Sequence, residues 1–341
     1  MAATLELDVH EGRAPSGWDE GLRAVGGVVF HCEAWADYKV REGGGEPLFF
    51  VWKEGAEVAG RALAIRRPGR ASRLGRLASK VSFDSPPATP GRSGDDYVAP
   101  LRPWSRRSPG LVEVSLGSFD ALGPWSPATP PHSRSRSEFP LPPGDAGAVW
   151  EGMRKLARRK VQRARKADLG IGVAGTERDF ADFVEVFAVT QERLRRNKDY
   201  VPGHGFEDEV FRDAVAGLSA SGAGRLYLAR DGARLEAAVL FATFGERAYL
   251  IHSVATDAGR DAGAPFLVVF EALRDLRESG LATINLGGAG GAAEDPASPD
   301  HGLFQFKTRF GAAPEPRTSG SLVPRPGRRR LVAATRRLVG R

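Results

Sequence analysis

The sequence has few of the residues that would tie it to a metal, a membrane or an oxidising compartment. Cys32 is its only cysteine, which excludes a disulfide within the chain and a cysteine cage for a metal. No apolar run approaches the roughly eighteen residues that a membrane-spanning helix needs. The N-terminus lacks the basic start and apolar block of a signal peptide, and the histidines lack metal-ligand spacing. We therefore expect a cytoplasmic protein without a metal.

Length and composition fit a globular protein of two domains. The chain has 341 residues, of which 41% are hydrophobic and 27% charged, so it can bury a sizeable core. Its net charge of +7 favours an anionic partner such as a nucleic acid, a phosphorylated substrate or an acidic membrane surface. The alternative is that the charge reflects solubility and a composition rich in Arg, Ala and Gly.

The positive charge is concentrated in residues 154–166, which contain eight Lys or Arg and no acidic residue. Such a run is often only a solvated helix face, but a solvated face usually intersperses acids for pairing one turn away. The absence of acids favours contact with phosphate, and the candidates are Arg158, Arg159 and Arg163. No aromatic residues are interleaved, so sequence-specific reading of a nucleic acid is not supported.

Prolines dominate the middle of the sequence. Thirteen of the 24 prolines lie between Pro86 and Pro143, a spacing that nearly excludes regular helix. We expect long loops around two short strands at residues 111–116 and 136–141. From Thr318 onward the chain is rich in Pro, Gly and Arg, which predicts a flexible basic tail that could contact a membrane or a nucleic acid.

The second half has clear hydrophobic periodicity and turn signals. The predicted order is helix, strand, two helices, three strands, helix and strand, then a short helix and a possible last strand. The predicted ranges are 145–167, 170–174, 176–196, 207–220, 225–230, 235–244, 247–255, 264–279 and 282–286.

A weak internal repeat accompanies this pattern. Residues 48–63 and 226–240 both predict a strand, an acidic-Gly turn and a second strand. Helical stretches precede the first copy at about residues 17–25 and 33–41, as two helices precede the second. Hairpins converge easily, but this context favours a duplicated domain.

Four groups of residues carry a resemblance to a known family. They are Trp150 with Arg158-Arg159-Lys160 and Gly170-Ile-Gly-Val173, then Thr190 with Arg193, then Gly280 with Ile284-Asn-Leu-Gly287, and finally Gly302-Leu-Phe-Gln-Phe-Lys307 with Phe310-Gly311. In this order they resemble the GNAT superfamily, and most specifically its Fem-like branch of peptidoglycan bridge aminoacyltransferases and BioF2-like acetyltransferases. They cover about half of the chain.

The resemblance implies an α/β fold of two GNAT-like domains, each with a mixed, mainly antiparallel sheet flanked by helices, and a substrate channel between them. The implied boundaries are residues 1–143 and 144–317, followed by the tail at 318–341. A Gly-Pro segment in the family's first domain has only a loose counterpart in Asp84-Ser-Pro-Pro87, and the coiled-coil insertion of some tRNA-using members is missing. Both departures count against tRNA as the carrier of the acyl donor, and they leave the acyltransferase class intact.

The resemblance also implies site residues. Lys307, in the closing motif with Arg309, would lie at the channel and stabilise negative charge without acting as a base. Arg193 would contact substrate. Tyr249 and His252 lie on the strand expected beside the opening of the sheet, and their alternating positions predict opposite faces. His252 could accept a proton from an attacking ammonium, although a buried histidine more often has a structural role.

For the acyl donor, we expect backbone N–H groups near Ser253, Val254 and Ala255 to stabilise the oxyanion. Arg260 and Gly263 lie in a segment similar to the pyrophosphate loop of acyl-CoA-binding GNAT domains, but Pro265 departs from that pattern. An ordinary turn with Pro at the start of a helix is the alternative.

The sequence thus predicts an N-acyltransferase that moves an acyl or aminoacyl group to an amine, acting in Fem-like fashion on a cell-envelope precursor. One alternative is an acyl-CoA-dependent N-acetyltransferase of a small amine or amino sugar. Another is a non-catalytic protein that binds RNA or a membrane surface. The co-substrate would be acyl-CoA or aminoacyl-tRNA. The donor, the acceptor and the oligomeric state are not fixed by the sequence.

Overall fold

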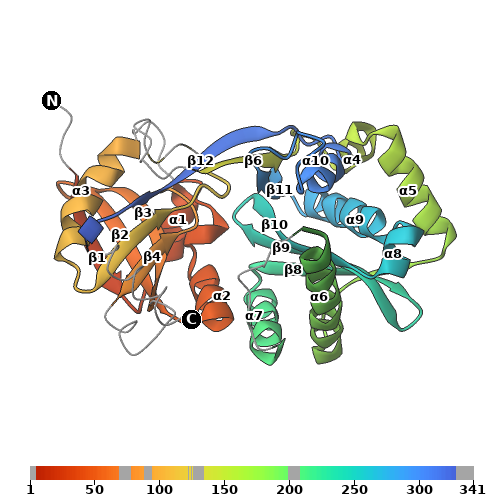
Figure 1. Ribbon diagram of the computed structural model, residues 1–341, viewed down its shortest axis with the longest axis horizontal. Helices are drawn as coiled ribbons and strands as arrows, with labels where there is room; N and C mark the ends of the chain where they lie inside the picture. Colours follow the sequence, from red (N-terminus) through yellow and green to blue (C-terminus); the bar gives the residue numbers. More distant parts are fainter. Residues whose placement is uncertain are drawn as a thin grey trace. The chain divides into compact units, whose positions relative to one another are not determined.

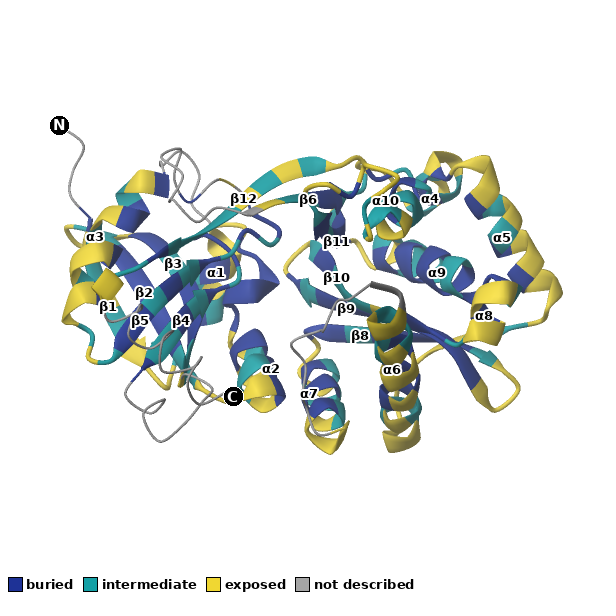
Figure 2. Cartoon of the chain, in the orientation of Figure 1, coloured by how far each residue is buried: buried dark blue, intermediate teal, exposed yellow. Residues whose placement is uncertain are grey.

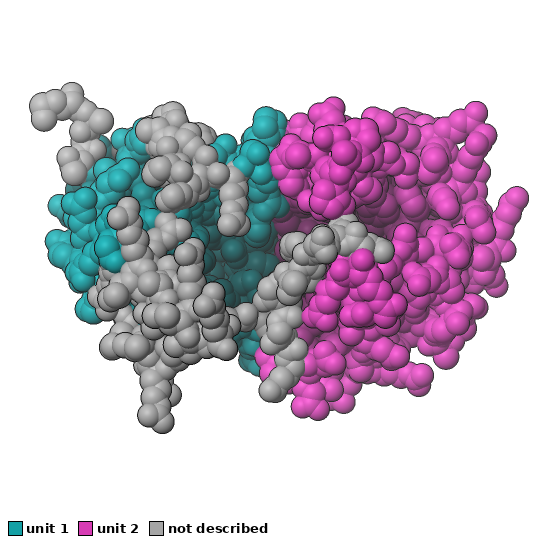
Figure 3. All heavy atoms as spheres, in the orientation of Figure 1, with its two compact units in different colours: residues 1–136, 316–341 teal, residues 137–315 magenta. Residues whose placement is uncertain are grey.

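The computed structural model describes residues 5–68, 78–87, 94–121, 123, 125, 134–198 and 208–327. The chain divides into two compact units (Figure 3). Unit 1 comprises residues 1–136 and 316–341, and unit 2 comprises residues 137–315. Among the residues described, no helix is both long and apolar enough to span a membrane.

Unit 1 contains a six-stranded sheet in the order β1-β2-β3-β4-β5-β12. Its strands pair antiparallel except for β4 and β5, which are parallel. Its elements are β1 (Glu6–Glu11), α1 (Trp18–Ala24), η1 (Val29–His31), α2 (Glu33–Gly43), β2 (Glu46–Glu54), β3 (Glu57–Pro68), β4 (Ser79–Phe83), α3 (Gly94–Arg107), β5 (Leu111–Leu116) and β12 (Glu315–Leu322).

Unit 2 contains a second sheet in the order β6-β11-β10-β9-β8-β7. Strands β7 to β10 pair antiparallel, and β10 and β11 are parallel. Its elements are β6 (Arg134–Pro140), α4 (Ala146–Gly152), α5 (Lys155–Lys166), β7 (Gly170–Val173), α6 (Glu177–Lys198), α7 (Asp208–Ala220), β8 (Gly224–Asp231), β9 (Arg234–Phe244), β10 (Arg247–Ala255), α8 (Asp257–Ala262), α9 (Ala264–Glu278), β11 (Thr283–Gly290) and α10 (His301–Thr308).

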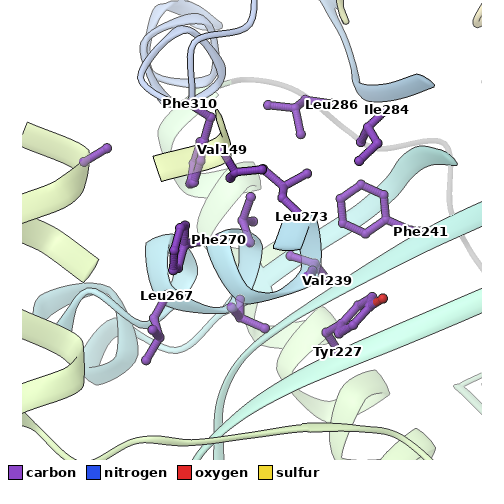
Figure 4. Close-up of a cluster of buried hydrophobic side chains, with 14 of the residues drawn as sticks. Val149, Tyr227, Val239, Phe241, Leu267, Phe270, Leu273, Ile284, Leu286 and Phe310 are labelled. Atoms are coloured by element: carbon purple, nitrogen blue, oxygen red, sulfur yellow. The ribbon is translucent and has the colours of Figure 1, made fainter. Parts of the chain in front are cut away.

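The core of unit 2 lies between α9 and the sheet. Leu267, Phe270 and Leu273 of α9 belong to one buried hydrophobic cluster with Val239 and Phe241 of β9 (Figure 4). Helices α6 and α7 cover the other face (Figure 1). The sequence favours these elements locally: Thr176 and Asp179 cap the start of α6 reciprocally, and Pro265 occupies the first turn of α9.

The predicted duplication is confirmed. In both units a strand, two helices, an antiparallel hairpin, a further strand, a helix and a parallel strand follow in the same order. The predicted hairpins are β2–β3 and β8–β9, one in each sheet. The predicted fold class of two GNAT-like α/β units with mixed sheets is therefore correct.

The two units exchange their last strands. Strand β6 follows β5 in sequence but joins the sheet of unit 2 beside β11, whereas β12 returns to unit 1 and pairs with β5. The expectation of a flexible tail from residue 318 is therefore wrong up to Leu322. Composition suggested flexibility, but backbone hydrogen bonds to β5 do not depend on side-chain type, and Leu322 is buried. Residues 328–341 lie outside the described residues.

Two helix predictions also need correction. Helix α3 lies within the proline-rich stretch and contains Pro100 and Pro103. Each internal proline costs about 3 kcal/mol, but the helix buries Tyr97, Val98 and Leu101, which contribute about 1.5–3 kcal/mol each. The burial therefore offsets the cost of the prolines.

The predicted helix 145–167 is in fact two helices, α4 and α5, which meet at Met153 and Arg154. The closing segment of the domain is fastened at this break, because the Arg154 N–H donates to the Arg309 carbonyl oxygen at 2.9 Å. Gly311 lies so close that a Cβ there would be 2.7 Å from the Gly152 carbonyl oxygen. A straight helix would lack this junction.

Candidate functional site

The central feature of unit 2 is a pair of parallel strands that separate. Strands β10 and β11 are paired only from Arg247↔Thr283 to Tyr249↔Asn285, although β10 continues to Ala255 and β11 to Gly290. The equivalent strands of unit 1, β4 and β5, stay paired from Ser79↔Leu111 to Phe83↔Leu116. Where paired strands separate, their backbone N–H and C=O groups become accessible in the middle of the sheet. Among the described parallel strand pairs, the separation occurs in unit 2, between β10 and β11.

A β-bulge lies where the strands separate. The pairing of β10 with β9 goes from Leu250↔Phe241 to His252↔Leu240 and omits Ile251. Tyr249 pairs with Ala242, two residues from Leu240, so Tyr249 and His252 belong to the same face of the sheet. The expectation of opposite faces is wrong, because the extra residue shifts the alternation by one.

Lys307 is buried beside this opening, with 4% of its surface exposed. Its Nζ donates to the Gly288 carbonyl oxygen at 2.7 Å and lies 5.3 Å from the centre of the Phe139 ring. A side chain built at Gly287 would meet this Nζ and the Tyr249 ring, each at 3.5 Å. Lys307 and Tyr249 therefore border the same glycine.

His252 has a different environment. Its ring lies 5.4 Å from the ring centres of Phe187 and Phe211 and 6.4 Å from that of Phe183. These phenylalanines come from α6 and α7, and His252 is half-buried among them. The aromatic contacts fit a packing role at least as well as a proton-transfer role.

The end of β10 is held by α6. Thr190 Oγ1 accepts from the Ala255 N–H at 3.2 Å and donates to the Ala255 carbonyl oxygen at 3.3 Å. The Ala255 N–H therefore already has an acceptor, which weighs against its predicted part in an oxyanion hole. Val254 is buried and Ser253 is exposed. Thr190 is a structural contributor whose role the sequence did not indicate.

Two arginines converge beside this strand end. Arg193 and Arg260 lie 3.7 and 3.8 Å from the same oxygen of Asp257, a carboxylate that is 81% exposed. Arg193 also donates to the Ala255 carbonyl oxygen at 3.4 Å. Burial, followed by the charge of Arg260, lowers the pKa of Arg193.

In the segment predicted to resemble a pyrophosphate loop, three backbone N–H groups already have acceptors. The N–H groups of Gly259, Arg260 and Gly263 donate to Thr256 Oγ1, the Thr256 carbonyl and the Arg260 carbonyl, respectively. Gly263 has φ +90°, and a Cβ there would lie 2.7 Å from the Lys160 carbonyl oxygen of α5. Helix α5 therefore packs closely against the backbone at Gly263, just before α9.

The candidate arginines of α5 separate into two kinds. Arg158 donates to the carbonyl oxygens of Met153 and Glu151, so it clips the junction of α4 and α5. Arg159 and Arg163 are exposed, and α5 presents this exposed side to solvent (Figure 2). In the described part of the chain, neither has an acidic partner.

The remaining candidates lie elsewhere. Arg309 donates to Gln305 Oε1 at 2.7 Å along α10. Asp84 belongs to unit 1 and accepts from Trp35 Nε1 at 2.9 Å. Within the described ranges, no group of three or more His, Cys, Asp or Glu side chains could hold a metal ion.

Two polar residues at the opening were given no role from the sequence: Asn285, which was quoted only within Ile284-Asn-Leu-Gly287, and Glu138. Asn285 Nδ2 donates to a Glu138 carboxylate oxygen at 3.2 Å, and the Gly287 N–H donates to Asn285 Oδ1 at 2.8 Å. The available signal was a polar Asn285 within a mainly apolar and glycine-rich strand, followed two residues later by Gly287.

Comparisons with known proteins agree with this geometry. A family described as acetyltransferase (GNAT) domain matches residues 152–304. No curated protein sequence gives a significant match. The fold resembles a crystal structure of FemX, with a TM-score of 0.66 at 12% identity, covering 97% of this chain and 100% of that one.

Two further structures match over most of both chains. L-PGS from Bacillus licheniformis gives a TM-score of 0.54 at 10% identity and covers 98% of each chain. A tandem GNAT protein from the clavulanic acid biosynthesis pathway gives 0.53 at 13% identity and covers 94% of this chain and 99% of that one. At these identities the likeness concerns the fold. Residues 152–304 therefore match the GNAT acetyltransferase domain family, and the chain as a whole has the fold of tandem GNAT structures.

Proposed function

We propose that this protein is an N-acyltransferase whose reaction takes place where β10 and β11 separate in unit 2. The observation that carries the proposal is the separated strand pair with buried Lys307 at its opening. A separated sheet exposes fixed backbone groups to a substrate, and a buried ammonium is a preorganised positive charge. Unit 1 has the same order of elements but keeps its parallel strands paired, which supports unit 2 as the reacting unit.

The proposed chemistry needs little covalent participation by the protein. The nitrogen of an acceptor amine forms a bond to the acyl carbon, the bond from that carbon to the donor oxygen breaks, and the amine proton leaves with the oxygen. Positioning the two reactants and stabilising the oxyanion supply the rate enhancement. Lys307 stabilises the negative charge, and Tyr249 borders the same space.

The features around α5 favour an aminoacyl ester on RNA over an acyl-CoA thioester as donor. Gly263 packs against Lys160, and the N–H groups of Gly259, Arg260 and Gly263 already have acceptors, so these three N–H groups offer a CoA diphosphate no cradle. The outer side of α5 instead carries Lys155, Arg159 and Arg163 one turn apart. Like charges at this spacing destabilise a helix unless an anion compensates them.

The acceptor we propose is an amine on a phosphorylated cell-envelope precursor. Arg193 and Arg260 face one exposed carboxylate, and a phosphate could replace that carboxylate between them. The resemblance to Fem-like proteins supports a peptidoglycan precursor. An acyl-CoA-dependent acetyltransferase and a non-catalytic binding protein are the alternatives that the test distinguishes.

The test offers the purified full-length chain an aminoacyl-tRNA mixture or acetyl-CoA, with a nucleotide-linked muropeptide as acceptor, and detects the new amide by mass spectrometry. We expect transfer from aminoacyl-tRNA that Lys307→Met strongly reduces. Transfer from acetyl-CoA alone would show that the donor assignment is wrong. Binding of either donor without any transfer would favour the non-catalytic alternative.

A further inference from the structure

We propose that Asn285 is a positioning residue. Oriented by Glu138, it fixes the turn at Gly287 and so holds the Lys307 ammonium at the opening between β10 and β11. Its effect on rate rests on the proposed function, whereas its effect on Lys307 can be measured without any reaction.

The orientation of the Asn285 amide is fixed by its partners. The Gly287 N–H can only donate, so the atom 2.8 Å away must be Oδ1. Glu138 presents a carboxylate oxygen 3.2 Å from the other atom, which must then be the Nδ2 donor. A flipped amide would place donor against donor on one side and acceptor against acceptor on the other. The Gly287 N–H and the Glu138 carboxylate therefore both favour the same orientation of the Asn285 amide.

The turn that Asn285 fastens carries the acceptor of Lys307. Asn285 is the last residue of β11 that pairs with β10. Gly287 then turns with φ +74°, and a Cβ there would lie 2.8 Å from the Leu250 carbonyl oxygen, so the two strands are close at this point. The next carbonyl, that of Gly288, accepts from Lys307 Nζ at 2.7 Å. Movement of the turn would thus move the acceptor.

The burial of this set favours a role beyond packing. Glu138, Asn285 and Lys307 are 1%, 3% and 4% exposed, respectively. Buried polar networks cost free energy unless their members are satisfied, and apolar side chains of similar size often stabilise a core equally well. A chain of oriented donors and acceptors that ends on an ammonium is instead suited to hold that charge in one place.

The test uses a role swap. Asn285→Ala removes the acceptor for the Gly287 N–H. The double variant Glu138→Gln with Asn285→Asp restores it, because the introduced aspartate accepts both from the Gly287 N–H and from the amide of the introduced glutamine. The single variant Asn285→Asp places two carboxylates side by side. It therefore tests this substitution without the compensating Glu138→Gln. Thr308→Val, also on α10 and buried, controls for loss of a hydroxyl outside this network.

Two readouts are measured on the full-length protein. In a ¹⁵N-lysine-labelled sample, the Lys307 ammonium, assigned with Lys307→Met, should exchange slowly with water in the parent and in Thr308→Val. Asn285→Ala should speed this exchange, and the swap should return it to the parent value. In the transfer assay, Asn285→Ala should lower kcat about 10- to 100-fold with little change in KM, and the swap should recover most of the loss.

The outcomes separate the two proposals. Absence of transfer by the parent protein contradicts the proposed function, but the exchange measurement still decides the role of Asn285. Slow exchange of Lys307 in folded Asn285→Ala overturns the positioning role. If Asn285→Ala does not fold, the double variant Glu138→Gln with Asn285→Asp decides alone. Slow exchange of the Lys307 ammonium in this double variant supports the positioning role of Asn285. Rapid exchange, or failure of the double variant to fold, contradicts it.

Discussion

At the scale of single residues, Lys307 stands out as a buried lysine with defined contacts. An ammonium with 4% exposure is costly to bury, and here a carbonyl oxygen and the face of Phe139 compensate it. We expect Lys307→Met to preserve the fold and lower the transfer rate about 10²- to 10³-fold, because one preorganised charge is removed.

The matched variant is Arg309→Met in the same closing segment. Arg309 contacts Gln305 and is half-exposed, so its loss should leave the rate within a few-fold of the parent. Rates and thermal unfolding are compared for both variants. Equal losses of rate in the two would show that α10 as a whole, rather than the Lys307 charge, supports the reaction.

A second prediction concerns His31 in unit 1. Its Nδ1 accepts from the Leu63 N–H at 3.1 Å, and its Nε2 donates to the Pro86 carbonyl oxygen at 2.9 Å. Burial lowers the pKa of His31 from 6.5 to about 4, against the opposing effect of the bond to Pro86. The unfolded chain therefore binds a proton first, and stability falls as pH falls from 6.5 towards 4.

Between pH 7 and pH 5 this amounts to about 2 kcal/mol of unfolding free energy. In His31→Gln, which keeps an acceptor and a donor but does not titrate in this range, the pH dependence should be flatter by that amount. Urea unfolding followed by tryptophan fluorescence at the two pH values measures it. An equal change in unfolding free energy between the two pH values for parent and variant would show that His31 does not cause the pH dependence.

At the scale of elements, helix α5 allows two roles of arginine to be separated. We expect Arg159→Gln with Arg163→Gln to leave thermal stability unchanged and to weaken RNA binding. The slope of the logarithm of affinity against the logarithm of salt concentration should become shallower by about 0.7–0.9 for each phosphate that is no longer neutralised. Arg158→Gln should instead lower the unfolding temperature, because Arg158 holds the carbonyls of Met153 and Glu151. Binding is measured by fluorescence anisotropy over a salt series.

If the double variant binds RNA with the parent's affinity and salt slope, the exposed cations are a solvated face. Loss of stability in the double variant without change in binding would assign them a structural role.

The elements also show how far sequence patterns extend. Hairpins β2–β3 and β8–β9 and helices α6, α7 and α9 followed from periodicity and turn residues, because their local preferences agree with the fold. Helix α3 did not, since burial of Tyr97 and Leu101 outweighs Pro100 and Pro103, and that burial is set by the distant strands of the sheet.

The candidate site was less accessible to prediction for a similar reason. Lys307 and Tyr249 were identified, but the bulge that omits Ile251 leaves no mark in the sequence and reversed the expected face of His252. The close packing at Gly263 involves α5, which lies about one hundred residues earlier in the chain. Arg158 and Arg159 are neighbours in the same basic run of the sequence. Only the structure shows that Arg158 contacts backbone carbonyl oxygens whereas Arg159 is exposed.

At the scale of the whole molecule, the duplicated units are linked by the exchange of their last strands. Strand β12 follows all of unit 2 in the chain but pairs with β5 from Gly320↔Leu116 to Leu322↔Val114 in unit 1. Ser319 and Ser118 are hydrogen-bonded at 2.9 Å, and Leu322 is buried in the core of unit 1. The sheet of unit 1 is therefore completed by a strand that follows unit 2 in the chain.

We expect removal of residues 316–341 to destabilise unit 1, whereas removal of residues 328–341 alone, which keeps β12, should not. Burial of Leu322 contributes about 2 kcal/mol, which corresponds to a decrease of about 4–8 °C in the midpoint for a unit of this size. Tryptophan fluorescence reports mainly on unit 1, because all but Trp150 of the six tryptophans lie within residues 1–136. Equal midpoints for the two truncations would show that β12 adds no stability to the sheet of unit 1, and the exchange would then have no part in joining the stability of the two units.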